Sequence, residues 1–68
     1  MTDVALVELG TLDPGEWVRL KCGDIGIIRD KVNQPGYRKA SVEVPGHRYP
    51  IRIIQFVEKV QHLPLRHP

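Results

Sequence analysis

Residues 16–22 read Glu-Trp-Val-Arg-Leu-Lys-Cys, and apolar side chains alternate with polar ones along this stretch. A period of two is typical of a strand with one buried face, because successive side chains point to opposite sides. We therefore expect Val18, Leu20 and Cys22 to face a core. Trp17 falls on the other face, where it either packs against the apolar N-terminal residues or is exposed for a functional role.

Turn signals bound this predicted strand on both sides. Asp-Pro-Gly occupies residues 13–15 and Gly-Asp occupies 23–24. Proline fixes φ and glycine tolerates positive φ, so both stretches favour chain reversals. Residues 25–32 are rich in β-branched side chains and form a second predicted strand. Gly26 within it indicates a bulge or a close approach of another backbone.

Two further strands are predicted downstream. Residues 38–44 place an alanine and two valines on one face, in alternation with polar side chains. Residues 48–54 follow a Pro-Gly turn, and Tyr49, Ile51 and Ile53 share one face of that stretch. We therefore expect Tyr49 to fill the core.

The remaining segments carry weaker patterns. Pro50 has no N–H to donate, which predicts an edge strand or a bend at that point. Residues 4–9 form either a strand or an apolar turn, and residues 55–60 form either a single helical turn or a short strand. Residues 60–63 are predicted to complete a closing strand.

No stretch of ten or more residues carries a helical period, so the chain is predicted to be all-β, an antiparallel meander of about five short strands. Closure into a barrel would remove its open edges. We expect the barrel to span residues 13–63, with residues 1–12 as an apolar segment packed on it and residues 64–68 as a flexible tail.

The elements follow one another as residues 14–20, residues 23–28, two strands joined by a Pro-Gly turn, and residues 56–63. This order resembles the SH3-like small barrels, the group that includes KOW and Tudor domains. The step Gly26-Ile27-Ile28 is similar to the glycine-then-aliphatic step of the KOW pattern. The resemblance implies a five-stranded antiparallel SH3-like barrel.

Composition limits the class of protein. A chain of 68 residues allows one domain, and a hydrophobic content of 41% is too high for a disordered chain. No apolar run is long enough to span a membrane, and the N-terminal residues lack the pattern of a secretory signal. Cys22 is the single cysteine, so no internal disulfide can form, and we expect a reducing, cytoplasmic location.

Signals for catalysis or metal binding are weak. Cys22 is expected in the core, and Ser41 has no histidine near it in the strand pattern. His47, His62 and His67 lack the close spacing of zinc ligands, and no phosphate-binding glycine pattern occurs. The plasmid-borne dihydrofolate reductases resemble the chain in size and barrel type, but their Val-Gln-Ile-Tyr motif is missing. We expect no cofactor, no metal and no enzymatic activity, with an active site shared between subunits as a third alternative.

Charge is distributed unevenly along the chain. Residues 1–28 hold two basic and five acidic side chains, a net −3, whereas residues 29–52 hold six basic and two acidic side chains, a net +4. A basic face on residues 29–52 predicts contact with nucleic acid or another polyanion such as an acidic protein surface, with tyrosines available for stacking. The predicted binding residues are Arg29, Lys31, Tyr37, Arg38, Lys39, His47, Arg48 and Arg52.

The alternative is a structural or assembly subunit that self-associates or docks on a larger complex, such as a phage particle or a multi-subunit enzyme. A barrel this small has more apolar residues than its interior can hold. Trp17, Ile27 and Ile54 are the predicted protein interface. The sequence leaves both hypotheses open.

Overall fold

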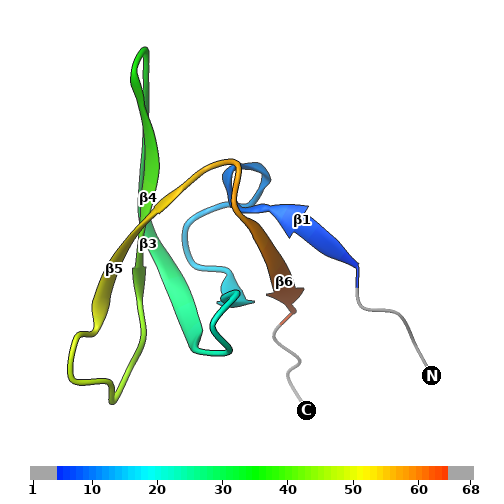
Figure 1. The fold of residues 1–68 in the computed structure, drawn as a ribbon, viewed down its shortest axis with the longest axis vertical. Coiled ribbons are helices and arrows are strands. Elements are labelled where there is room, and N and C mark those ends of the chain that lie inside the picture. The colour runs from blue at the N-terminus through cyan, green and yellow to red at the C-terminus, as the bar shows by residue number, and fades with distance from the viewer. Residues whose placement is uncertain (1–4, 65–68) are drawn as a thin grey trace.

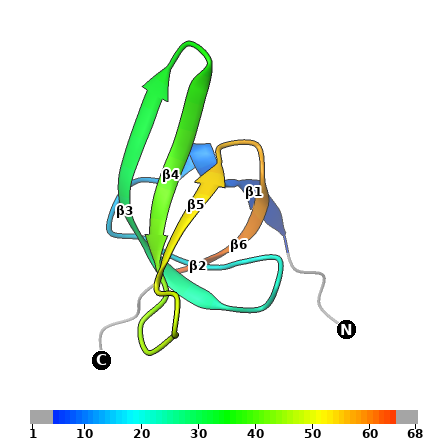
Figure 2. The ribbon, with the colours of Figure 1, turned by 60° about the vertical axis from the view of Figure 1, so that its left-hand side comes forward.

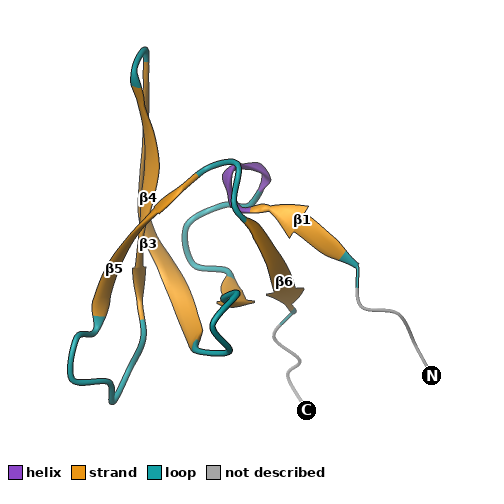
Figure 3. Ribbon diagram, viewed as in Figure 1, coloured by secondary structure: helices purple, strands orange, loops and turns teal. Residues whose placement is uncertain are grey.

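The computed structural model describes residues 5–64, and these form a curled sheet with almost no helix (Figures 1 and 3). Its strands are β1 (Leu6–Glu8), β2 (Trp17–Arg19), β3 (Ile25–Gln34), β4 (Tyr37–Glu43), β5 (Ile51–Gln55) and β6 (Lys59–Leu63). A single 3-10 turn, η1 (Leu9–Thr11), follows β1. Apart from Pro64, the predicted tail lies outside the described residues, and so do residues 1–4 of the predicted N-terminal segment.

All six strands pair antiparallel in one sheet, in the order β1-β6-β2-β3-β4-β5 (Figure 2). The prediction of an all-β antiparallel fold is confirmed. The structure differs from the predicted closed barrel of five strands, because it has six strands and its two edges, β1 and β5, do not pair with each other. The segment that the sequence left as strand or turn is both, since β1 pairs with β6 and then runs into η1.

The core lies on the concave face of the sheet. Val18, Ile28, Val42 and Val60 come from four different strands and are almost completely buried, and Leu9 of η1 covers them from one end. Strand alternation brings them together, as predicted for β2 and β4. Burial of an aliphatic side chain stabilises a fold by about 1.5–3 kcal/mol, so this small cluster is a main source of stability.

Gly26 lies where β3 passes close to the end of β4. A Cβ atom at this position would lie 2.7 Å from the main-chain oxygen of Glu43 and 2.7 Å from Cγ1 of Val42. The close approach predicted at Gly26 is therefore confirmed. The irregularity in strand pairing lies further along, where the register of β3 against β4 shifts between Ile28 and Asp30.

β5 has the opposite phase from the one predicted. Arg52 and Ile54 are in register with the buried positions of β4 and face inward. Ile51 and Ile53 face outward, and Tyr49, which was expected to fill the core, is 66% exposed. Isoleucines stand at both 53 and 54, so either phase would bury an aliphatic side chain. The edge position predicted from Pro50 is confirmed, because β5 ends the sheet.

The prediction that Cys22 faces the core is wrong, since Cys22 is exposed. β2 ends at Arg19, and a tight turn follows in which the N–H of Leu20 donates to the oxygen of Asp24 at 2.7 Å and the N–H of Gly23 donates back to Leu20 at 2.9 Å. The alternation of the sequence continues through this turn, but the strand does not.

The connection between β5 and β6 is a turn, not a helix. The N–H of Glu58 donates to the oxygen of Gln55 at 3.1 Å, and β6 begins at the next residue. The last strand predicted from the sequence is confirmed, and it pairs with both β1 and β2. Among residues 5–64, no helix has the length and apolar character needed to cross a membrane.

Candidate functional site

The predicted basic residues do not lie on one face, and Lys31 is the clearest departure. The register shift in β3 turns Lys31 inward, opposite Ala40. Its Nζ donates to the main-chain oxygens of Gly10 at 2.8 Å and Leu12 at 2.7 Å, and lies 5.3 Å from the ring centroid of Phe56. Lys31 therefore holds η1 and its flanking residues over the core.

Two predicted arginines are paired with carboxylates. Nε of Arg29 lies 2.7 Å from Oε1 of Glu43 on the outer face of the sheet, and Nη2 of Arg52 lies 2.9 Å from Oδ2 of Asp24. Each pair cancels a positive charge locally. These arginines add little to a basic surface.

The remaining predicted cations, Arg38, Lys39 and Arg48, make no ion pair with any residue among 5–64. Two of them sit on exposed tyrosine rings. Nζ of Lys39 lies 5.1 Å from the ring centroid of Tyr37, and the guanidinium of Arg48 lies 5.7 Å from that of Tyr49. Cations at this distance are attracted to the face of an aromatic ring.

The two tyrosine–cation pairs lie at opposite ends of β4. Tyr37 begins β4 near the tip of the β3–β4 hairpin, which extends beyond the rest of the sheet, whereas Tyr49 lies in the loop after β4 (Figures 1 and 2). Arg38 is held near the hairpin tip by a 3.0 Å hydrogen bond from its Nε to Oδ1 of Asn33. A hollow of about 440 Å³ lies beside Tyr37 and is bounded on its other side by residues 55–57.

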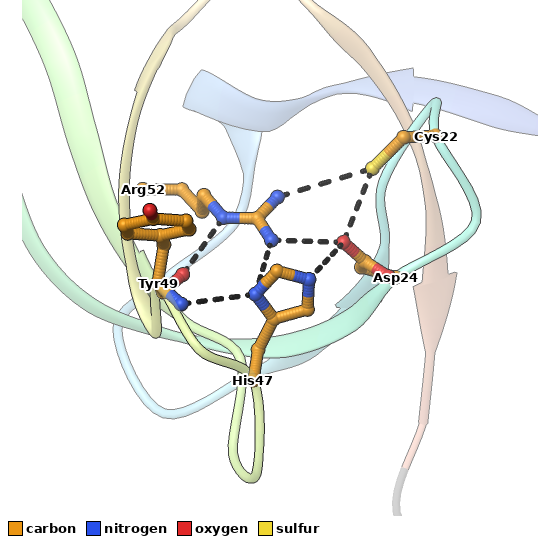
Figure 4. A network of polar contacts seen from close by, with 5 residues as sticks. All are labelled: Cys22, Asp24, His47, Tyr49 and Arg52. Carbon is orange, nitrogen blue, oxygen red and sulfur yellow. Dashed lines mark hydrogen bonds and ion pairs between the residues drawn. The ribbon is translucent and has the colours of Figure 1, made fainter.

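Asp24 is the centre of a polar network at the opposite end of the sheet from the hairpin tip (Figure 4). Its Oδ2 accepts from Nη2 of Arg52 at 2.9 Å and from the thiol of Cys22 at 3.5 Å. Nε2 of His47 lies 3.8 Å from the same oxygen. The main chain of Tyr49 completes the network, because its oxygen accepts from Nε of Arg52 at 3.0 Å.

The network lowers the pKa of Asp24 and fixes the hydrogen-bonding role of His47. The hydrogen bond from Arg52, and then the one from Cys22, lower the pKa of Asp24 below its ordinary value of 3.8. Nδ1 of His47 lies 3.1 Å from the N–H of Tyr49 and 3.1 Å from Nη2 of Arg52. Both neighbours are donors, so Nδ1 acts as the acceptor and a proton on a neutral ring lies on Nε2.

Sequence reasoning missed Asp24. The network joins the β2–β3 turn, the β4–β5 loop and β5. Its polar contacts therefore hold three separate segments of the chain together. Asp24 and Arg52 are 28 positions apart. No short sequence pattern indicates this pair. The sequence holds only a weak signal, namely an aspartate in the Gly-Asp turn of a chain whose residues 29–52 are basic.

The three predicted interface residues divide between the two faces. Trp17 is half-buried on the outer face, with Ile27 of β3 and Leu63 of β6 as its cross-strand neighbours. Its strand is separated from β1 by β6. Ile54 faces inward and packs against the core cluster. Trp17 and Ile27 thus form one apolar row with Leu63, and Ile54 lies elsewhere.

A groove of about 550 Å³ runs along the free edge of β5. Residues 51–55 form one wall, and residues 20–22 of the β2–β3 turn face them. Glu58 lines the groove where β5 ends. All five residues of β5 therefore line this groove.

Within residues 5–64, no three histidine, cysteine or acidic side chains are placed to hold a metal ion together. Comparisons of the chain with protein-family models, with curated proteins and with solved structures gave no match.

Proposed function

We propose that this chain is a non-enzymatic binding module that contacts single-stranded nucleic acid through the tip of the β3–β4 hairpin. The observation that carries the proposal is the exposed ring of Tyr37 with the ammonium group of Lys39 5.1 Å from its centroid. Arg38, between them in the chain, makes no ion pair with residues 5–64 and extends from the opposite face of β4, because successive side chains of a strand alternate. An aromatic surface flanked by uncompensated cations suits a stacked base and its phosphates.

The chemistry predicts modest affinity without strong sequence preference. Any base can stack on tyrosine, and phosphates carry no sequence information. Arg48 beside Tyr49 supplies a second pair of the same kind at the far end of β4. With about three phosphate contacts, the affinity for a single strand should fall about 20-fold between about 50 and about 200 mM salt.

As part of this proposal, we assign the fold to a variant of the SH3-like small barrel in which the two edge strands, β1 and β5, do not pair to close the sheet. The order of elements from β2 to β6 supports it, and so does the strong curl of the sheet. The runner-up function is an assembly subunit, which the exposed isoleucines of β5 favour. An enzyme whose active site is shared between subunits is a distant third.

Fluorescence anisotropy with a short, labelled single strand of mixed sequence tests the proposal. We expect binding at low salt, and a loss of roughly 10-fold or more in affinity for the double variant Tyr37→Ala, Lys39→Ala, because stacking and one phosphate contact are removed together. Arg29→Gln is the matched control, since Arg29 is already paired with Glu43. No binding at low salt, or equal affinities for the double variant and the wild type, would refute the proposal.

A further inference from the structure

The two edges of the sheet differ in how they are protected against pairing. β1 has three residues, and Glu8 at its end lies 3.8 Å from Lys59. β5 has five residues, and its two outward isoleucines, Ile51 and Ile53, are 56% and 58% exposed. Sheet edges are usually blocked by charge, shortness or proline within the strand. The outward positions of β5 carry no charge, and its one charged side chain, the inward Arg52, is paired with Asp24 at 2.9 Å. The edge therefore presents no unpaired charge to another strand.

The hydrogen bonds that flank β5 show which of its main-chain groups are free. The oxygen of Pro50 accepts from the N–H of Val44, and the N–H of Phe56 donates to the oxygen of Arg38. Antiparallel ladders alternate, so the even-numbered residues between them, Arg52 and Ile54, also bond toward β4. Residues 51, 53 and 55 therefore direct their N–H and C=O groups away from β4, although the oxygen of Gln55 also accepts from the N–H of Glu58 at 3.1 Å.

This set of free groups is symmetric about Ile53. A two-fold axis at Ile53 places Ile53 opposite its own copy and Ile51 opposite Gln55 of the second copy. Every free N–H then meets a C=O of the other copy, which is the geometry of hydrogen-bonded antiparallel pairs. The oxygen of Gln55 takes this bond as its second, because it also accepts from Glu58. A shift of the axis to Arg52 would instead set two arginines opposite each other, and like charges directly opposite are unfavourable.

Charges along the groove match the same arrangement. Lys21 lines the groove and is followed by Cys22, whose Sγ lies 4.0 Å from Nη1 of Arg52 near the start of β5, and Glu58 lines the groove beyond the end of β5. Antiparallel pairing brings the start of one strand beside the end of the other. Each Lys21 is thereby placed toward Glu58 of the second copy, whereas a parallel arrangement would bring like charges together.

We propose that two copies of this chain associate through their β5 strands, antiparallel and centred on Ile53, into one continuous sheet. The pairing adds main-chain hydrogen bonds at residues 51, 53 and 55 of each copy. It sets Ile53 against its own copy and Ile51 against Gln55 of the second copy. An edge of five residues makes a small interface, at or below the lower end for specific complexes. The dimer should therefore dissociate on dilution.

Sedimentation velocity of the full chain over a wide concentration range is the first test. The mass should rise from one copy toward two. The variant Ile53→Pro removes an N–H that bonds to nothing in the monomer, and proline is tolerated at an edge. We expect this variant to be monomeric at every concentration, whereas Ile53→Val should associate like the wild type.

A cross-linking experiment tests the register without relying on the proline variant. In a Cys22→Ser background, Ile53→Cys should form a disulfide dimer with copper phenanthroline, because Cα atoms of a hydrogen-bonded pair lie about 5.5 Å apart, within the disulfide range of about 4.4–6.8 Å. Ile51→Cys alone should not, since its two copies would be separated by four residue steps, about 13 Å.

A mixture of the Ile51→Cys and Gln55→Cys proteins should yield a heterodimer, because those positions face each other in the proposed register. Equal cross-linking of all single variants would overturn the register. A wild-type chain that stays monomeric at high concentration, together with no cross-linking of Ile53→Cys, would overturn the dimer. Oligonucleotide binding by the monomer is unaffected by either outcome.

Discussion

The guanidinium group of Arg52 and the carboxylate of Asp24 meet at 2.9 Å although the residues are 28 positions apart. Arg52 belongs to the edge strand β5, and Asp24 belongs to the turn between β2 and β3. The contact therefore joins two parts of the sheet that no main-chain ladder connects. It substitutes, at this end of the molecule, for the strand pairing that would close a barrel.

The contribution of Asp24 to stability should depend on pH. Its folded-state pKa lies below the ordinary value of 3.8, because Arg52 and Cys22 donate hydrogen bonds to the carboxylate. The carboxylate thus stabilises the fold at pH values above 3.8, and this contribution is lost as the pH falls below 3.8 through the folded-state pKa.

Urea unfolding of the wild type and of Asp24→Asn checks this dependence. The wild type should be the more stable at about pH 7, and the difference should shrink toward about pH 2. Asp13→Asn, in the exposed turn before β2, is the matched control. A difference between wild type and Asp24→Asn that does not change with pH would contradict the assignment.

Lys31→Met should destabilise the fold by about 2 kcal/mol, because two main-chain oxygens lose a charged donor. Methionine keeps an unbranched apolar stem of similar size, but it loses the ammonium group that lies 5.3 Å from the ring centroid of Phe56. Chemical denaturation measures the change. Lys59→Met is the control, since its ion pair with Glu8 is a surface pair worth less than about 1 kcal/mol. Equal effects of the two substitutions would show that Lys31 is an ordinary surface lysine.

Gly26→Ala should cost about 1–3 kcal/mol, because its methyl group would lie too close to the main chain of Glu43 and force β3 away from β4. Thermal unfolding measures the loss. Ser41→Ala, on the outer face of β4, should leave the midpoint nearly unchanged. An unchanged midpoint for Gly26→Ala would mean that the two strands separate easily here.

The phase of β5 can be tested with two neighbouring isoleucines. Ile54→Ala removes a half-buried side chain that packs on the core and should cost about 1–2 kcal/mol, less than a fully buried site. Ile53→Ala removes an outward side chain and should change stability by less than about 0.5 kcal/mol in the monomer. The reverse order, measured at low protein concentration, would restore the phase expected from the sequence.

The parts of the fold that the sequence predicted are those fixed by local alternation. β2 and β4 have one strictly apolar face each, and Val18 and Val42 are buried as expected. The phase of β5 was not predictable, because isoleucines at 53 and 54 satisfy either orientation. Contacts between distant segments decide it, namely the register against β4 and the pairing of Arg52 with Asp24.

The sequence predicts which basic and aromatic residues the chain has for a binding surface. It does not predict which of them lie together and unpaired on that surface. Net charge counts Lys31 and Arg29 with the other cations, but one is bound to main-chain oxygens and the other to Glu43. These partners lie 14 to 21 positions away, so no short window of sequence shows them. What survives of the predicted surface is the part near Tyr37 and Tyr49.

The register shift in β3 determines which of the residues after Ile28 face the interior. If Arg29 were paired with Ser41 and the register did not shift, Asp30 would lie opposite Ala40 on the inner face, and Lys31 would turn to solvent. The carboxylate of Asp30 would then face the main-chain oxygens of Gly10 and Leu12. All of these groups are hydrogen-bond acceptors, so they would repel one another. The shift at Arg29 therefore decides the sign of the charge that reaches the interior. Deletion of Arg29 is expected to keep that charge positive, because Asp30 would then follow Ile28 directly, opposite Ser41, with Lys31 still opposite Ala40.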